Sequence, residues 1–333
     1  MPNRGARRNI LRIAATVPVL GLMSAKARAK ETVTFGYLLD ASHEAVLYAI
    51  KSGRVTSSLI DVELHALAIP ALIQATSARQ YDVIETATLA IPRAALQGLS
   101  MVILSTAQRF RENTQDDDIW VGTTSPIHTV ADLRGKTLGV AAINSTGAAL
   151  VRFALWKKYG LNVQLEGGDV HFVELPPPAL MTALAAGKID AASQIAAQTY
   201  QGVKEDAIRS IARVGNDLHD LYGVYMVPAV NASYPDKLAA RPQAFEEFSR
   251  MLKASADYAL EHIDEVAAAV SPDTGQEPGY FKWWNERDAE FPATVSDADI
   301  KAIGKTFELA KELGVLQSYP DPSTLVWERA LRA

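Results

Sequence analysis

The sequence of 333 residues contains no cysteine. This absence excludes disulfide bonds, thiolate metal sites, iron–sulfur clusters and cysteine nucleophiles. Common catalytic motifs are missing too: there is no GxSxG elbow, HExxH pair, Walker loop or GxGxxG run, and the six histidines show no metal-ligand spacing. The sequence therefore predicts no enzyme activity, no metal site and no cofactor.

Charge is also sparse. Charged residues make up 21% of the chain, and the formal net charge is -5. A mildly acidic chain has no overall attraction for nucleic acid, so we expect no nucleic-acid partner. Hydrophobic residues make up 48%, which is a globular balance, and 333 residues suit two lobes better than one small core.

Residues 1–29 have the organisation of a secretory signal peptide. A basic start that ends at Arg12 precedes an apolar stretch from Ile13 to Met23, and small residues then lead to Ala27 and Ala29. Cleavage fits after either alanine, and paired arginines near the start leave the general and twin-arginine export routes both open. A membrane anchor is the weaker alternative, because a spanning helix needs about 20 apolar residues. No cysteine is present at the cleavage site to carry a lipid. We therefore expect an exported, periplasmic protein.

The remaining chain alternates between strand and helix patterns. We expect a first unit with strands at 32–38, 61–67, 81–85 and 101–104, and helices at 44–51, 70–78 and 88–97. We expect a second unit with strands at 119–122, 136–141, 170–175, 189–193 and 210–214, and helices at 146–159 and 177–186. A strand at 222–227 would lead back to helical patterns at 243–270, 279–284 and 297–313. This rhythm predicts the α/β class, with open, mostly parallel sheets flanked by helices.

One lobe-scale pattern occurs twice. Segments 70–85 and 177–193 each contain a helix that opens with proline and a following small-residue strand with an aspartate. The run Val-Ala-Asp-Leu-Arg-Gly-Lys at 130–136 and the turn Asn-Ser-Thr-Gly at 144–147 lie between them. In order and spacing, these motifs resemble the binding proteins for sulfonates, taurine, nitrate and thiamine-precursor pyrimidines.

The resemblance covers nearly the whole mature chain and implies a two-lobe periplasmic binding protein of type II. It implies that residues 30–117 and 226–333 form lobe 1 and that residues 118–225 form lobe 2. It further implies a monomer that holds a small organic solute between the lobes and delivers it to the membrane permease of an ABC importer. Hinges are expected near 116–122 and 220–227.

Ligands in open α/β sheets lie beyond the carboxyl ends of the strands. This rule and the resemblance together select the candidate ligand-binding residues Asp40, His43, Glu85, Thr86, Ser105, Thr106, Asn144, Ser145, Thr146, Gly147, Ser193 and Tyr222.

The 144–147 turn is the main candidate, because free N–H groups at a helix start favour a negative group. The alternative is an ordinary helix cap, for which Ser145 and Thr146 are equally apt. Asp40 and His43 fit an aromatic ring with an exocyclic amine, or else a capped helix with a solvated histidine beside it. An acidic residue at Glu85 disfavours a plain anion.

We therefore expect solute capture by hinge closure, with a sulfonate, carboxylate or related organic acid as the solute. A thiamine-precursor-like pyrimidine or another nitrogen heterocycle is an alternative solute. A sensor lobe for a membrane receptor would use the same cleft. An enzyme of pyrimidine or menaquinone-precursor synthesis is the alternative from another class, and the missing cysteines and the export signal both argue against it.

Overall fold

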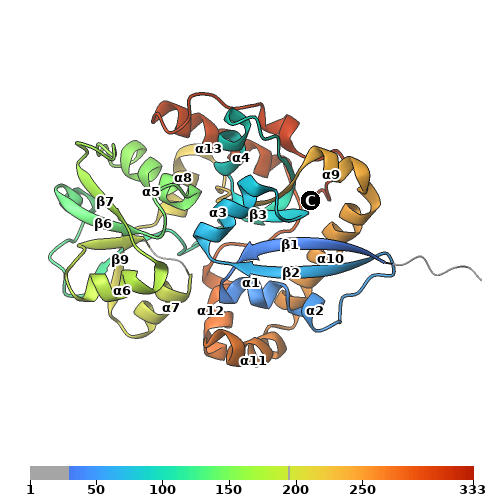
Figure 1. The fold of residues 1–333 in the computed structure, drawn as a ribbon. Coiled ribbons are helices and arrows are strands. Elements are labelled where there is room, and N and C mark those ends of the chain that lie inside the picture. The colour runs from blue at the N-terminus through green and yellow to red at the C-terminus, as the bar shows by residue number, and fades with distance from the viewer. Residues whose placement is uncertain (1–29, 194–195) are drawn as a thin grey trace, which may run out of the picture.

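The computed structural model describes residues 30–193 and 196–333, so the predicted signal peptide lies outside the described residues. The chain forms two five-stranded sheets, each flanked by helices, and the two sheets lie in separate lobes (Figure 1). Within the described residues, no helix is long and apolar enough to cross a membrane.

The first lobe contains a mixed sheet with the strand order β2-β1-β3-β10-β4. Its strands are β1 (Glu31–Leu38), β2 (Ile60–Leu67), β3 (Val83–Ala87), β4 (Val102–Gln108) and β10 (Ala229–Ser233). Strand β1 pairs in parallel with β2 and β3, whereas β10 runs antiparallel between β3 and β4. The sheet thus takes one strand from the chain after it returns from the other lobe.

The helices of the first lobe come from both ends of the described chain. Those from the first half are α1 (Ala41–Val46), α2 (Tyr48–Lys51), α3 (Ile69–Ala78) and α4 (Ala90–Leu96). Those after β10 are α9 (Pro235–Ala240), α10 (Pro242–Glu261), α11 (Ile263–Thr274), α12 (Pro278–Arg287), α13 (Asp297–Glu312) and the short 3₁₀ helix η2 (Pro322–Leu325). Both sets pack around one sheet, which ties the two ends of the described chain into one lobe.

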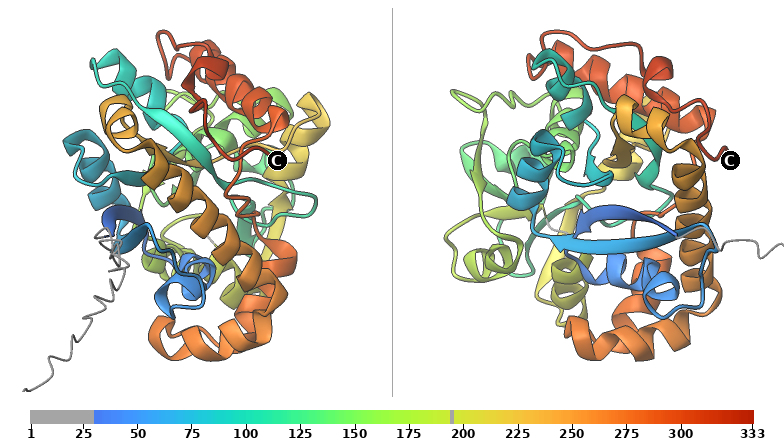
Figure 2. Two further views of the ribbon diagram at one scale, coloured as in Figure 1. Left: turned by 90° about the vertical axis from the view of Figure 1, so that its right-hand side faces the viewer. Right: turned by 45° about the vertical axis from the view of Figure 1, so that its right-hand side comes forward.

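Helix α10 shows why the tail is helical. Phe245, Phe248, Leu252 and Ala256 recur at helical spacing, and all four are buried where α10 lies along β1 and β2 (Figure 2). The apolar pattern predicted over 243–270 is split at His262, which takes a non-helical conformation with φ −123° and ψ 37°. The two segments therefore form separate helices, α10 and α11.

The second lobe repeats the arrangement with the strand order β7-β6-β8-β5-β9. Its strands are β5 (Ile119–Gly122), β6 (Lys136–Val140), β7 (Val170–Glu174), β8 (Ala191–Ser193) and β9 (Ile208–Ala212). Its helices are η1 (Val130–Leu133), α5 (Thr146–Lys157), α6 (Pro177–Ala185), α7 (Ala196–Lys204) and α8 (Val214–Tyr222). Strand β6 is parallel to β7 and β8, while β5 is antiparallel to β8 and β9.

Two segments connect the sheets, 109–118 on the way out and 223–228 on the way back. The prediction of a strand at 222–227 is wrong. Tyr222 ends α8, Gly223 closes that helix in the left-handed region with φ 65°, and the returning strand begins only at Ala229. Met226 and Val227 are buried where the chain crosses, and their carbonyl oxygens accept from the Phe110 N–H and the Thr88 hydroxyl. The lobe limits at 117/118 and 225/226 stay predictions.

Candidate functional site

A cavity of about 460 Å³ lies between the two lobes, and we call it the interlobe cleft. Residues at the carboxyl ends of β1, β3, β6 and β8 line the cleft, as expected for open α/β sheets. Helices α3 and α4, the first turn of α5, and both connecting segments complete the lining. The lining residues are Leu38, Ile69, Leu72, Ile73, Thr76, Ser77, Glu85, Thr86, Ala87, Ala90, Arg93, Ala94, Gln97, Gln108, Asp116, Asp117, Val140, Ala141, Asn144, Ser145, Thr146, Gly147, Ala148, Ser193, Pro228 and Ala229.

One wall of the cleft is apolar. Helix α3 contributes Ile69, Leu72 and Ile73, and α4 contributes Ala90 and Ala94. Ile73 is 51% exposed, which is a high value for a large aliphatic side chain at the edge of a cavity. Ligand pockets are lined largely by such side chains, with a few polar groups that fix orientation. The cleft can therefore bury the apolar body of a small organic molecule.

The turn at the start of α5 has partners within the protein. Ser145 caps the helix, because its hydroxyl accepts from the Ala148 N–H at 3.0 Å. Thr146 Oγ1 accepts from the backbone N–H of Leu89 in the other lobe at 3.0 Å. Arg93 also reaches across the cleft and donates to the carbonyl oxygen of Asn144. The turn thus caps a helix and joins the lobes, while its four residues 144–147 all line the cleft.

Asp117 lies directly against this helix start. A Cβ atom added to Gly147 would meet the Asp117 carboxylate oxygens at 2.5 and 2.6 Å, so the two residues are in close contact. The hydroxyl of Ser193 donates to the Asp117 backbone oxygen at 3.2 Å. Burial raises the pKa of Asp117 to about 6, although the Ser193 hydroxyl opposes this shift. The cleft thus holds a carboxyl group where a helix N-terminus favours negative charge.

Asp116 is the second acidic group of the connecting segment. Its side chain is 9% exposed and lines the cleft, and its Oδ1 atom has no hydrogen-bond partner among the described residues. Burial raises the pKa of Asp116 well above its usual range, and the neighbouring carboxyls of Asp288, Asp117 and Asp40 raise it further. An unpartnered buried acceptor suits a ligand that donates a hydrogen bond.

His43 and Glu85 form a buried pair behind the cleft. His43 Nε2 lies 2.9 Å from Glu85 Oε1, and the second carboxylate oxygen accepts from the Leu38 N–H at 3.1 Å. Burial alone would lower the pKa of His43, but Glu85 and Asp40 raise it to about 10. The imidazole is therefore protonated at neutral pH, and of the pair only Glu85 lines the cleft.

Asp40 caps the start of α1 and does not line the cleft. Its Oδ1 accepts from the Ser42 N–H at 2.9 Å and lies 3.9 Å from His43 Nδ1. Burial alone would raise the pKa of Asp40, but the contacts with His43 and Ser42 lower it. Neither Asp40 nor His43 lines the cleft.

The structure divides the other predicted site residues. Thr86 and Ser193 line the cleft, together with Glu85 and the 144–147 turn. Ser105 and Thr106 are buried in β4: the Ser105 hydroxyl accepts from Asn231, and Thr106 lines a smaller cavity beside His43. Tyr222 ends α8, with the Lys305 ammonium over its ring, and does not line the cleft.

Several cleft residues were not predicted from the sequence. Arg93, Gln97, Asp116 and Asp117 all line the cleft. The polar stretch 111–118 contains three consecutive aspartates at 116–118, which could have indicated a site. Nothing in the local pattern distinguishes Arg93 from a solvated arginine in the exposed turn of a helix.

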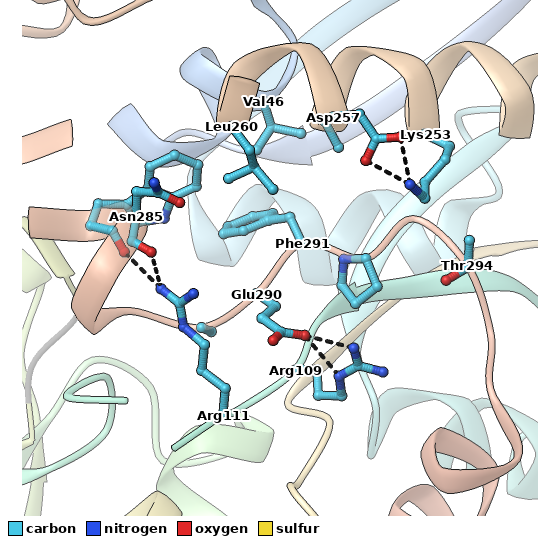
Figure 3. Close-up of a pocket in the computed structure, with 14 residues that line it drawn as sticks. Val46, Arg109, Arg111, Lys253, Asp257, Leu260, Asn285, Glu290, Phe291 and Thr294 are labelled. Carbon is cyan, nitrogen blue, oxygen red and sulfur yellow. Dashed lines mark hydrogen bonds and ion pairs between the residues drawn. The ribbon is translucent and has the colours of Figure 1, made fainter. Parts of the chain in front are cut away.

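A second cavity, of about 300 Å³, lies within the first lobe beside α10 and α12 (Figure 3). Its cations are already engaged by protein groups. Arg109 pairs with Glu290 at 2.6 Å, Lys253 pairs with Asp257 at 2.5 Å, and Arg111 donates to backbone carbonyls at the end of α12. Since one lobe lines this cavity, hinge closure would not enclose its contents. The interlobe cleft is therefore the candidate binding site.

In the described residues, no group of three or more His, Asp or Glu side chains is placed to hold a metal ion. Two α/β lobes, two connecting segments and a cleft between the lobes are the features of the periplasmic binding protein fold.

Residues 57–217 match the family model described as "ABC transporter, phosphonate, periplasmic substrate-binding protein". This match and the fold agree with the resemblance to periplasmic binding proteins seen in the sequence. The curated proteins contain no match to this sequence.

Solved structures with the same fold include proteins with distant sequences. The alkanesulfonate-binding protein SsuA from Xanthomonas axonopodis pv. citri, bound to MOPS, has 18% identity and a TM-score of 0.73, over 92% of this chain and 100% of that chain. The aliphatic sulphonate binding protein SsuA from Escherichia coli has 15% identity and a TM-score of 0.72, over 91% and 99%. A Candida albicans protein with the generic periplasmic binding protein fold has 18% identity and a TM-score of 0.65, over 91% and 98%. These structures confirm the two-lobe α/β fold.

Proposed function

We propose that this protein is exported to the periplasm, captures a small organic solute in the interlobe cleft and delivers it to the membrane permease of an ABC importer, without chemical turnover. The cleft supports this proposal because both lobes and both connecting segments line it. Hinge closure would then enclose the solute, and the closed form would dock on the permease.

The composition of the cleft favours a nitrogen-containing solute. Glu85, Asp116 and Asp117 line it, while Arg93 is the one cation among the described lining residues. The Arg93 guanidinium already donates to a backbone carbonyl. Carboxylates and an unpartnered acceptor select amines, amidines or amino-substituted heterocycles, which donate hydrogen bonds. We therefore propose a solute with an apolar body and a nitrogen group that faces Asp116. This acidic lining is the observation that carries the proposal.

A sulfonate, carboxylate or related organic acid is the second candidate. Two relatives of the fold are named as sulfonate-binding proteins, and the start of α5 lines the cleft with free backbone donors. Arg93 would be the partner for such an anion. The two candidates differ in the sign of charge that the cleft accepts, so one panel of compounds separates them.

Thermal unfolding of the purified, exported protein tests the proposal against primary amines, amidines, aminopyrimidines, alkanesulfonates and carboxylates. A solute at 100 times its dissociation constant stabilises the fold by about 2.7 kcal/mol, which gives a clear rise in Tm. We expect the nitrogen compounds to raise the Tm. An Ala90→Trp variant, which fills the cleft, should lose the shift, while Leu165→Trp on the exposed surface should keep it.

Other outcomes would contradict parts of this proposal. A shift with sulfonates or carboxylates alone would replace the nitrogen solute with an organic acid. NMR of the protein–compound mixture would reveal any conversion of a bound compound into a product. Such conversion would overturn solute capture and favour an enzyme.

A further inference from the structure

Asp117 places an anion of the protein itself at the start of α5. The added-Cβ distance of 2.5 Å from Gly147 to Asp117 Oδ2 shows that the carboxylate lies against the first turn of this 12-residue helix. The first N–H groups of a helix lack partners within the helix and attract negative groups. The carboxylate of Asp117 would therefore repel an anionic solute that approached this turn.

The backbone of Asp117 is unusual as well. Its φ of 59° lies in the left-handed region, which is uncommon for residues other than glycine, although aspartate and asparagine enter it more often than most. Ser193, at the end of β8, donates its hydroxyl to the Asp117 carbonyl and lies 3.5 Å from Oδ1. A strained residue that its surroundings hold in place is a reason to look for a function there.

Asp116 provides an independent observation in the same cleft. Its Oδ1 atom is buried and has no partner in the described part of the chain, so a second acceptor is available beside Asp117. The carboxylate of Asp117 repels a sulfonate or carboxylate, and the unpartnered oxygen of Asp116 accepts from a hydrogen-bond-donating nitrogen group.

We propose that Asp117 is the specificity-determining residue of the cleft: its carboxylate occupies the anion position at the start of α5, excludes anionic solutes, and with Asp116 selects a nitrogen-containing one. This inference rests on the proposed function, because it concerns the same cleft. The inference assigns the choice between anionic and nitrogen-containing solutes to the side chain of Asp117. Replacement of that side chain should therefore allow anions to bind at the start of α5.

The test compares the wild-type protein with Asp117→Asn by isothermal titration with ethanesulfonate, benzenesulfonate and benzoate. Asparagine keeps the size of the side chain and tolerates the left-handed conformation, so the fold is retained. We expect at least one of the three anions to bind Asp117→Asn at least tenfold more tightly than it binds the wild type. An Asp117→Gly variant, which also tolerates this φ, should show the same direction of change.

Asp273→Asn is the matched control, because it removes the same charge from an exposed position in α11. It should leave all three affinities within twofold of wild type. Affinities of Asp117→Asn and Asp117→Gly within twofold of wild type for all three anions, or no detectable binding by either variant, would overturn the inference.

The outcomes also separate this inference from the proposed function. If the wild type binds nitrogen compounds but neither variant gains an anion, the role of Asp117 fails and the proposed solute class stands. If the variants gain anions and the wild type binds no nitrogen compound, the role of Asp117 stands and the proposed solute class fails.

Discussion

His43 Nε2 and Glu85 Oε1 lie 2.9 Å apart, and each side chain is 5% exposed. The pair connects α1 to the end of β3, directly behind the interlobe cleft. Because burial removes both groups from water, removing one partner leaves the other charged and unpaired. The first prediction follows from this contact.

Glu85→Gln should lower the free energy of unfolding by about 3 to 5 kcal/mol at pH 7, because the buried imidazolium of His43 then loses the nearer of its two carboxylate partners. Urea unfolding measures the change. The matched control is Glu63→Gln, which breaks the His65–Glu63 pair on the surface, where Glu63 is 59% exposed. That loss should be about 1 kcal/mol or less. Equal losses for the two variants would contradict a buried ion pair.

The same pair predicts a pH dependence. The pKa of His43 is raised to about 10 in the folded protein from an ordinary value of 6.5. Its contribution to stability is therefore fully present below pH 6.5 and is lost as the pH rises through about 10. The nitrogen NMR shifts of the His43 ring should stay those of an imidazolium at pH 8. A neutral ring at that pH would show that Glu85 and Asp40 do not hold the proton.

Asp288 should destabilise the folded protein at neutral and higher pH. Burial, and secondarily the charge of Asp40, raises the pKa of Asp288 to about 7, while its hydrogen bond from the Ala289 N–H opposes the shift. The folded state therefore binds the proton more tightly than the unfolded state, so the stability from this group falls as the pH rises from about 4 to about 7. Asp288→Asn should be more stable than wild type by about 2 to 4 kcal/mol at pH 8.

Urea unfolding at pH 4, 6 and 8 checks this prediction. The advantage of Asp288→Asn should shrink toward zero at pH 4, which is close to the ordinary pKa of 3.8 that the carboxyl has in the unfolded state. Asp273→Asn, on the exposed face of α11, should show no such trend. An advantage that is the same at all three pH values would mean that ionisation of Asp288 is not the cause.

Thr146 should control closure of the lobes. Its hydroxyl accepts from the N–H of Leu89, a residue that is fully buried. In Thr146→Val this N–H loses its partner, which costs about 1 to 3 kcal/mol in the closed form and weakens solute binding by roughly 5- to 150-fold. Small-angle X-ray scattering of the free protein should show a larger radius of gyration.

Ser145→Ala is the control for that experiment. It removes the helix cap, at a cost of about 1 kcal/mol, and leaves the Leu89 contact in place. Its radius of gyration should match that of the wild type. If Thr146→Val and Ser145→Ala scatter alike, the contact between Thr146 and Leu89 does not hold the lobes together.

Much of the fold could be predicted because its signals are local. Alternation and β-branching located the strand at 32–38, and proline at a first-turn position located the helix at 70–78, each within about a residue of β1 and α3. The error at 222–227 also has a local cause. Val224, Met226 and Val227 are apolar because the returning chain is buried, and burial without strand pairing gives the same sequence pattern.

The site was less predictable because its residues come together only through tertiary contacts. The loops after β3 and β6 were expected from the strand-end rule, and Glu85, Thr86 and residues 144–147 do line the cleft. Arg93 and Asp117 gave no such signal, since what distinguishes them is a contact with the other lobe or with the start of α5. Asp40 and His43 have the residue types of a binding site, but in the structure they lie behind the cleft, where they hold Glu85 and α1.

The sequence by itself determined the class of this protein: two α/β units in one chain, no cysteine chemistry, and motifs in the order of a solute-binding family. Hydrophobic periodicity and turn residues determine helices and strands over a few neighbouring positions. A single sequence therefore shows these signals directly. Only the tertiary structure decided the character of the cleft. It brought Asp117 against Gly147 and buried Asp116 without a partner, because the sign of charge that a cavity accepts depends on which side chains share it.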